Sequence, residues 1–288
     1  MRAIELGLTS RRARWGWFLG LLALGLALAG CRRSDSAAEL RVATSTSYLE
    51  AAARDLLGDD VQVMRLAEPG SCPGHFDIRP SQAAELRRCR LLLRFNFQSS
   101  LDSFVSGSDG TNRVQVVEVV MGEGLCKPET YLAGCEQIAK ALVANGWLAQ
   151  TNADARMRAV AVRLEKLGET ATNRMAQAGL RGRSVIASAH QKAFCEWLGL
   201  KVAASFRAAD SSSVAEIDGA ISQGKLAGVK LVVANLPEGR RLADALGERL
   251  QAKVAALGNF PALKNGRVSF DDMVAGNLDE LVKAAGGQ

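Results

Sequence analysis

This chain has few aromatic residues, only two histidines and only a small excess of positive over negative charge. Aromatics make up 5% of the 288 residues, too few to favour platforms for stacking nucleic-acid bases. The net charge is +6, and half of that excess falls in residues 1–30. The remaining basic side chains are interleaved with acidic ones, without the one-sided stripe that a phosphate backbone requires. No nucleic-acid partner is therefore expected. The 48% hydrophobic content is typical of a globular protein with a real core.

Only one apolar run is extended, from Trp15 to Ala29, and it is shorter than the roughly 20 residues of a membrane-spanning helix. Arginines precede it and small residues follow it, an order typical of an export signal. Its end, Leu28-Ala29-Gly30-Cys31, resembles a bacterial lipobox, in which the peptide is cut before the cysteine and that cysteine carries the lipid. We predict a signal peptide at 1–30 and lipidation of Cys31. An uncleaved anchor helix is the alternative.

Five cysteines remain after Cys31, and five is an odd number. Disulfides are permitted in an oxidising compartment, yet at least one of these thiols must stay free, bind metal or pair between molecules. The five are Cys72, Cys89, Cys126, Cys135 and Cys195.

Short β-rich runs alternate with helical patterns along the rest of the chain, and the alternation occurs twice. The predicted strands are Leu40–Thr44, Val61–Leu66, Leu91–Phe95, Val114–Val120, Ser184–Ser188, Val202–Phe206, Leu231–Asn235 and Lys253–Leu257. The predicted helices are Ser47–Leu57, Ser81–Arg88, Thr130–Ala144, Asn152–Ala178, Gln191–Leu198, Ser213–Gln223, Gly239–Leu246 and Asp271–Ala284.

Strands separated by helices pair in parallel through right-handed crossovers. The predicted fold class is therefore α/β, with two lobes that each hold a parallel four-stranded sheet flanked by helices. The predicted domains are an N-terminal lobe at 31–150, a linking helix at 151–180 and a C-terminal lobe at 181–288. A single long helix without proline would leave the cleft between the lobes little hinge freedom.

The chain has only two histidines, and both follow predicted strands. His190 comes directly after Ser184–Ser188, and His75 lies in the loop after Val61–Leu66. A lone histidine is usually a surface or core residue, but two at strand ends favour a shared metal, because ligands of open parallel sheets lie beyond the carboxyl ends of the strands. Glu129 is the third candidate. It stands at a predicted helix start, where a carboxylate also complements the helix dipole without any metal.

These loops resemble the ligand loops of the zinc and manganese ABC-transporter binding proteins. The resemblance rests on Pro69-Gly70 with Pro73-Gly74-His75-Phe76-Asp77 and Pro80-Ser81, on Pro128-Glu129-Thr130-Tyr131-Leu132, and on Ser188-Ala189-His190-Gln191-Lys192-Ala193-Phe194. Glu129 stands where the family usually has histidine. The family's fourth ligand would fall near 258–261, where only Asn259 is polar, so that ligand is unassigned.

The resemblance implies a lipid-anchored, exported, monomeric binding protein that captures a divalent metal in the cleft and delivers it to an ABC permease. It implies His75, Glu129 and His190 as metal ligands. Two imidazoles and a carboxylate suit zinc, manganese or iron, and zinc is the first choice. Cys72 and Cys126 stand beside two ligand loops, as extra ligands, as a disulfide or as simply packed residues. The disulfide is favoured, with Cys126–Cys135 as a competing pair.

Two other function classes stay open at this point. A metal-dependent enzyme could use the same two histidines and carboxylate, but such enzymes usually bring their ligands closer together in sequence. A relative that has lost metal binding could recognise another small molecule or act as an interaction lipoprotein. We expect no enzymatic activity.

Overall fold

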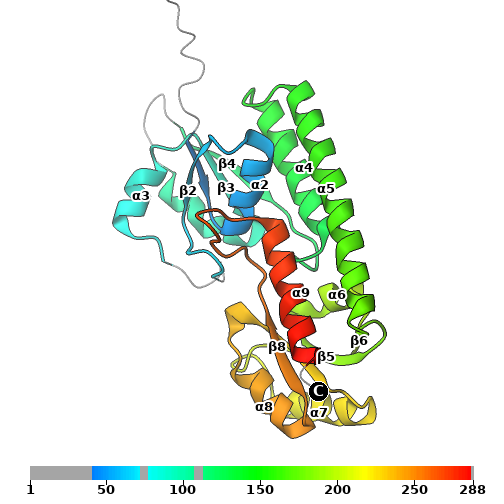
Figure 1. Cartoon of the computed structure of the whole chain (residues 1–288). Helices are drawn as coiled ribbons and strands as arrows, with labels where there is room; N and C mark the ends of the chain where they lie inside the picture. The colour runs from blue at the N-terminus through cyan, green and yellow to red at the C-terminus, as the bar shows by residue number, and fades with distance from the viewer. Residues whose placement is uncertain (1–40, 72–76, 107–112, 287–288) are drawn as a thin grey trace, which may run out of the picture. The chain divides into compact units, whose positions relative to one another are not determined.

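The computed structural model describes residues 41–71, 77–106 and 113–286 (Figure 1). The first half of the described chain forms sheet A, with parallel strands in the order β2-β1-β3-β4. These strands are β1 (Arg41–Thr44), β2 (Gln62–Arg65), β3 (Leu91–Phe95) and β4 (Gln115–Val119). They are connected through α2 (Ser47–Leu57), α3 (Pro80–Leu86) and the 3-10 segment η2 (Asn96–Phe104).

The second half forms sheet B, whose parallel strands follow the corresponding order β6-β5-β7-β8. These strands are β5 (Ser184–Ser188), β6 (Lys201–Phe206), β7 (Leu231–Asn235) and β8 (Lys253–Leu257). The connecting elements are α6 (Ala189–Trp197), α7 (Val214–Leu226), the short 3-10 turn η3 (Leu236–Glu238) and α8 (Arg241–Leu250).

The apolar pattern of each strand explains its place in its sheet. β3 and β7 are buried at every residue, as strands covered by helices on both faces must be. The edge strands β4, β6 and β8 mix exposed or half-buried residues with buried ones, and the edge strand β2 has only exposed and half-buried residues. The carboxyl ends of β5, β7 and β8 lie beside one another at one edge of sheet B, which is where parallel sheets bind ligands.

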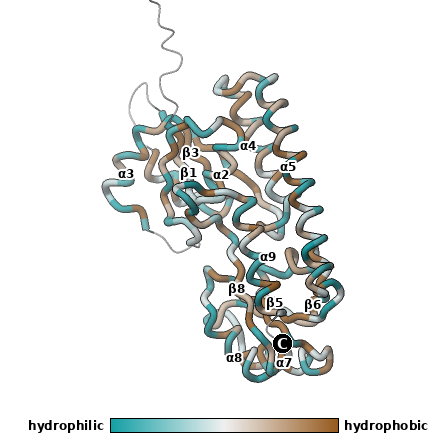
Figure 2. The backbone as a smooth tube through the Cα atoms, in the orientation of Figure 1, coloured by the Kyte–Doolittle hydropathy of each residue, from teal (hydrophilic) through white to brown (hydrophobic). Residues whose placement is uncertain are grey.

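Three longer helices complete the fold: α4 (Pro128–Ala144), α5 (Gln150–Gln177) and α9 (Phe270–Gly286). α5 buries one stripe, made of Ala153, Val160, Leu164, Ala171 and Met175, and its other residues are mostly exposed. Figure 2 shows the resulting alternation of hydrophilic and hydrophobic residues along α5. α5 packs on α2 and α4, and a Cβ added at its Gly168 would lie 3.6 Å from the Trp197 ring of α6. One long helix thus contacts elements next to both sheets.

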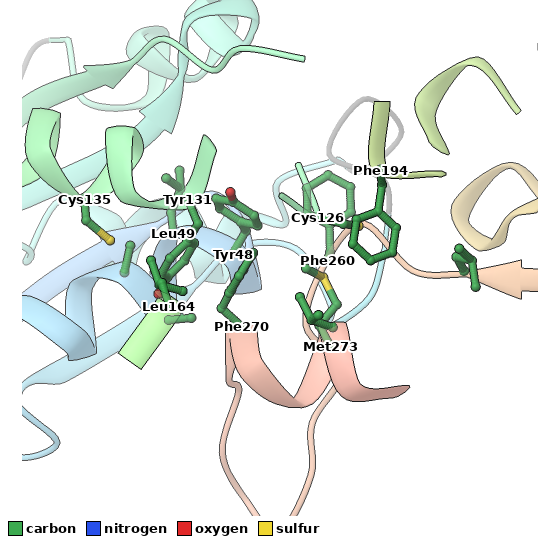
Figure 3. Packing of buried hydrophobic residues seen from close by; sticks show 14 of the residues in the cluster. Tyr48, Leu49, Cys126, Tyr131, Cys135, Leu164, Phe194, Phe260, Phe270 and Met273 are labelled. Atoms are coloured by element: carbon green, nitrogen blue, oxygen red, sulfur yellow. The ribbon is translucent and has the colours of Figure 1, made fainter. Parts of the chain in front are cut away.

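One cluster of buried apolar residues extends from one sheet to the other (Figure 3). The Tyr131 ring of α4 stacks on the Phe270 ring of α9 with centroids 4.1 Å apart. Tyr48 of α2 meets both rings edge-on. Because α9 follows directly on sheet B while α2 and α4 flank sheet A, these aromatic contacts bury the start of α9 against the first lobe.

An ion-pair cluster ties α5 to α2 and α9. The Arg163 guanidinium of α5 lies 2.6 Å from the Asp55 carboxylate of α2 and 3.4 Å from that of Asp271 at the start of α9. Tyr131 donates its hydroxyl to Asp55 at 2.7 Å. Burial raises the pKa of Asp271, and Arg163 offsets part of that rise. The cluster limits how far the three helices can move apart.

The structure confirms the predicted fold class. α2 and the strands β3, β5, β7 and β8 have the predicted limits, and most other boundaries differ by one to three residues. α8 begins two residues later than predicted, because Gly239 takes a left-handed backbone (φ 80°) after η3. It ends four residues later than predicted, at Leu250. From Leu40 onward the chain packs as one unit, so the predicted limits at 150 and 180 stay predictions. Among the described residues, no helix is long and apolar enough to span a membrane.

Candidate functional site at the carboxyl edge of sheet B

Buried amides gather where β5, β7 and β8 end. Gln191, in the first turn of α6, is fully buried. Its amide nitrogen donates to Asn235 Oδ1 at 3.2 Å, to the Leu257 carbonyl at 3.3 Å and to Asn259 Oδ1 at 2.9 Å. Each acceptor belongs to the end of a strand or to the loop that follows it. A single amide group therefore joins three segments at this edge.

Cys126 brings the other lobe into the same network. Its Sγ lies 3.1 Å from the Gly258 carbonyl, 3.2 Å from Asn259 Oδ1 and 3.9 Å from Gln191 Oε1. The Asn277 amide of α9 donates to this sulfur at 3.5 Å and to the Gly258 carbonyl at 2.9 Å. We call the set formed by Cys126, Gln191, Asn235, Asn259 and Asn277 the neutral seam. All five residues are buried.

A glycine allows the Cys126 loop to approach α6 this closely. Gly124 has φ +78°, which side chains other than glycine rarely adopt. A Cβ at this position would lie 3.0 Å from the Ala193 Cβ of α6. The turn thus places Cys126 in the interior between the lobes, three residues before Glu129.

The chemistry of the neutral seam does not suit a divalent cation. Burial raises the pKa of the Cys126 thiol well above its ordinary value, so the thiol stays protonated. The other four members are amides, and their hydrogen bonds already run between one another and to backbone carbonyls. A buried dication needs compensating negative charge, which these groups lack. The seam therefore holds the two lobes together without a bound ion.

An exposed imidazole and a mostly buried carboxylate lie side by side at the same edge of sheet B. The His190 side chain is 63% exposed, and its Nε2 lies 3.3 Å from Glu238 Oε1. The other oxygen of Glu238 accepts the Ser188 hydroxyl at 2.8 Å. Ser188 ends β5 and caps α6, and Glu238 ends η3 after β7. We call His190 and Glu238 the rim pair.

Glu129 lies at the other end of α6. It is exposed, and its Oε1 accepts the indole N–H of Trp197 at 3.0 Å. Trp197 is the last residue of α6 and His190 is the second, so about 10 Å of helix rise separates their backbones. In the structure, the side-chain contact of Glu129 is thus with Trp197, and that of His190 is with Glu238.

The remaining predicted positions Cys31, Cys72 and His75 lie outside the described residues. Within the described ranges, no three His, Cys, Asp or Glu side chains gather in a way that could hold a metal ion. Because His75 is not among them, the ligand set of His75, Glu129 and His190 stays a prediction.

Neither pairing predicted for Cys126 is formed in the structure, where Cys126 and Cys135 are both free, buried thiols. Cys126 Sγ faces the β8–α9 loop, whereas Cys135 lies on α4, one turn after Tyr131. Cys89 and Cys195 are free and buried as well.

The sequence also matches a family model. The model described as "Zinc-uptake complex component A periplasmic" covers residues 42–284. The chain belongs to this family. The match spans both sheets, α5 and nearly all of α9. The zinc-uptake component family is one of periplasmic metal-binding proteins that work with ABC-transporter permeases. No curated protein matches the sequence closely enough to count as a relative.

Solved structures share the fold of this zinc-uptake family member at low sequence identity. A manganese-bound S38A mutant of a periplasmic metal-binding protein from candidatus liberibacter asiaticus matches with a TM-score of 0.68 and 16% identity, covering 84% of this chain and 98% of that one. The solute-binding protein FpvC from pseudomonas aeruginosa, in complex with Mn²⁺, matches with a TM-score of 0.66 and 16% identity, over 86% and 99% of the two chains.

Sequence reasoning missed most residues of this edge. Gln191 stands beside His190 in the sequence, but a glutamine amide does not have the ligand chemistry that pointed to the histidine. The sequence pointed to Asn259 only as the one polar residue near the position of the fourth ligand. Glu238 could have been found by examining every carboxylate within a few residues of a strand end, the same rule that singled out His190.

Proposed function

We propose that this chain is a lipid-anchored solute-binding protein that captures a divalent transition metal and delivers it to an ABC permease. Zinc is the first choice of cargo, and manganese or iron are alternatives. The observation that carries the proposal is the exposed imidazole of His190 beside a carboxylate at the carboxyl edge of sheet B, where parallel sheets bind ligands. Family membership supports the same class of cargo. The protein acts as a monomer with one permease partner.

The proposed ligands are His75, Glu129 and His190, from three loops that follow strands. Glu129 Oε1 accepts the indole N–H of Trp197, so binding of a cation by this carboxylate would alter that hydrogen bond. Metal capture would then change the surroundings of Trp197. Tryptophan fluorescence is therefore a direct probe of whether Glu129 takes part.

Metal analysis tests the cargo. The full chain is purified without added metal, its metal content is measured, and Zn²⁺, Mn²⁺ and Fe²⁺ are titrated into the wild type and into His75→Ala, Glu129→Gln and His190→Ala. The proposal predicts one ion per chain and a severe loss of affinity in the variants. Unchanged affinity in any two variants would refute the shared site. A wild type that takes up none of the three metals would refute the metal cargo.

Two further measurements address the rest of the proposal. Cells lacking the protein should lose uptake of the cargo metal and regain it from the wild-type chain but not from His190→Ala. A turnover screen with the metal-loaded protein should find no reaction. A catalysed reaction that requires His190 would favour the metal-dependent enzyme.

The lipid anchor has its own test. Mass spectrometry of the membrane fraction should show cleavage before Cys31 and a lipid on that residue. Cys31→Ser should leave an unprocessed precursor. Normal processing and lipid labelling of this variant would exclude the anchor.

A further inference from the structure

Glu238 is a mostly buried carboxylate whose ion pair among the described residues is with a histidine and not with a lysine or arginine. Its side chain is 18% exposed. Among the described residues, the groups that contact the carboxylate are the His190 ring and the Ser188 hydroxyl, and no lysine or arginine forms an ion pair with it. Every other ion-paired carboxylate with a side chain as buried as this one has an arginine beside it, as Glu50 has Arg54 and Arg65 and as Asp55 has Arg163. Glu238 thus lacks the cation that the other buried carboxylates have.

The spacing of the rim pair leaves both side chains near enough to serve as ligands of one ion. An N–H···O bond usually spans about 2.9 to 3.0 Å between heavy atoms. His190 Nε2 and Glu238 Oε1 are 3.3 Å apart. Two ligand atoms at about 2.1 Å from a tetrahedral zinc ion lie about 3.4 Å from each other. The observed distance therefore matches adjacent coordination positions.

Ser188 fixes the orientation of this carboxylate. Its hydroxyl donates to Glu238 Oε2 at 2.8 Å and accepts the backbone N–H of His190 at 3.4 Å. One hydroxyl thus positions both members of the rim pair and leaves Glu238 Oε1 facing the imidazole. Hydrogen bonds of this kind orient the ligands in metal sites.

We propose that His190 Nε2 and Glu238 Oε1 together bind a divalent transition-metal ion as adjacent ligands. Because His190 is 63% exposed, water or another ligand can fill the remaining coordination positions, and the ion can exchange with solvent. This inference rests on the proposed function, since it adds Glu238 to the site that takes up the same cargo. Imidazole and carboxylate are donors that suit zinc and manganese.

The competing explanation is that Glu238 only complements the positive end of α6. A carboxylate near a helix N-terminus contributes about 0.3 to 1 kcal/mol of stability and needs no metal. The two explanations differ in whether the charge of Glu238 affects metal affinity.

Calorimetric titration of Zn²⁺ into the full chain separates them. The variants are Glu238→Gln, His190→Ala and the control Glu196→Gln, which removes an exposed carboxylate from the same helix. Glu238→Gln should bind Zn²⁺ at least about tenfold more weakly than the wild type, as His190→Ala should, and Glu196→Gln should match the wild type. Co²⁺ loaded in place of Zn²⁺ should show a visible spectrum that both rim variants change.

The outcomes distinguish this inference from the proposed function. Wild-type affinity in Glu238→Gln, together with weakened binding in Glu129→Gln, would overturn the role of Glu238 and leave the proposed function standing. Weakened binding in both rim variants with normal permease-dependent uptake would support the site and overturn the proposed cargo role. A folded wild type that binds no Zn²⁺ or Mn²⁺ would overturn both.

Discussion

The neutral seam and the rim pair occupy the same edge of sheet B, yet they differ in every electrostatic property. The seam is buried, uncharged and hydrogen-bonded within itself, with Cys126 and Gln191 at its centre. The rim pair combines an exposed imidazole with a carboxylate that forms no ion pair with a lysine or arginine in the described part of the chain. Only about one helical turn separates Gln191 from the capping residue Ser188.

This difference indicates how one edge can serve two purposes. A buried network must satisfy its own polar groups, because each one left unpaired costs about 1 to 3 kcal/mol. Once satisfied, it has no capacity for a cation, and it holds the lobes in one arrangement. An imidazole–carboxylate pair whose imidazole is open to solvent can gain or lose an ion without disturbing the core. We therefore expect changes in the seam to affect stability and changes in the rim to affect metal binding.

The largest effect on stability should come from Gln191→Leu. Leucine removes an amide that serves Asn235, the Leu257 carbonyl and Asn259, and leaves these acceptors buried without it. The free energy of unfolding should fall by about 2 to 4 kcal/mol. Urea denaturation measures this change. Gln223→Leu on the exposed face of α7 is the matched control and should stay within about 0.5 kcal/mol of the wild type. Equal losses in both variants would contradict a structural role for the seam.

The second-largest expected effect is a loss of stability of the seam at alkaline pH. The pKa of Cys126 is raised by burial above its ordinary value of 9.0. Because the folded-state pKa lies above the unfolded one, the stability from this thiol is fully present below about pH 9 and is lost as the pH rises, by about 1.4 kcal/mol per pH unit. Cys89, with a pKa of about 11, and Cys195, with one of about 12, add losses of the same sign.

Cys126→Ser isolates the contribution of this one thiol. Urea denaturation between about pH 8 and pH 10 should show a shallower loss of stability in the variant than in the wild type. His190→Ala serves as the control from the rim and should keep the wild-type slope. A Cys126→Ser slope equal to that of the wild type would indicate that the seam opens before its thiol ionises.

Glu129→Gln should have a smaller effect on stability, about 0.3 to 1 kcal/mol, because the residue stands in the first turn of α4. The glutamine oxygen can still accept the Trp197 indole. If Glu129 is a ligand, Zn²⁺ should shift the Trp197 emission in the wild type and not in the variant. Trp147→Phe removes the other tryptophan of residues 31–288 and makes the signal specific. Equal shifts in wild type and variant would exclude Glu129 from the site.

The smallest effect on stability should come from the rim itself. Without metal, Glu238→Gln and His190→Ala should each change the free energy of unfolding by less than about 1 kcal/mol, as is usual for a pair near the surface. With saturating Zn²⁺, the wild type should gain in melting temperature and both variants should gain less. Thermal unfolding with and without Zn²⁺ measures both quantities. A large loss of stability without metal would instead indicate that the rim pair stabilises the fold.

The sequence determined the fold class of this protein. Short, mostly apolar runs such as Leu91–Phe95 and Leu231–Asn235, each with one polar residue, are typical of central strands in covered parallel sheets, and the observed strands have the predicted limits. The pattern of Asn152–Ala178 likewise predicted α5, because a buried stripe at helical spacing is a local property of the chain. Such patterns depend on neighbours in sequence, so the sequence alone displays them.

Only the tertiary structure decided which polar residues meet. Cys126 and Asn277 are 151 residues apart, and a left-handed turn at Gly124 together with the packing of α9 brings them into contact. Glu129 was predicted as a metal ligand together with His75 and His190, and only the tertiary structure shows that its carboxylate accepts the indole N–H of Trp197. Glu238 faces His190 because β5 and β7 are neighbours in sheet B, a pairing that the order of strands in the sequence does not specify. Contacts between distant segments depend on a few ångströms of packing, and no local pattern of residues encodes that distance.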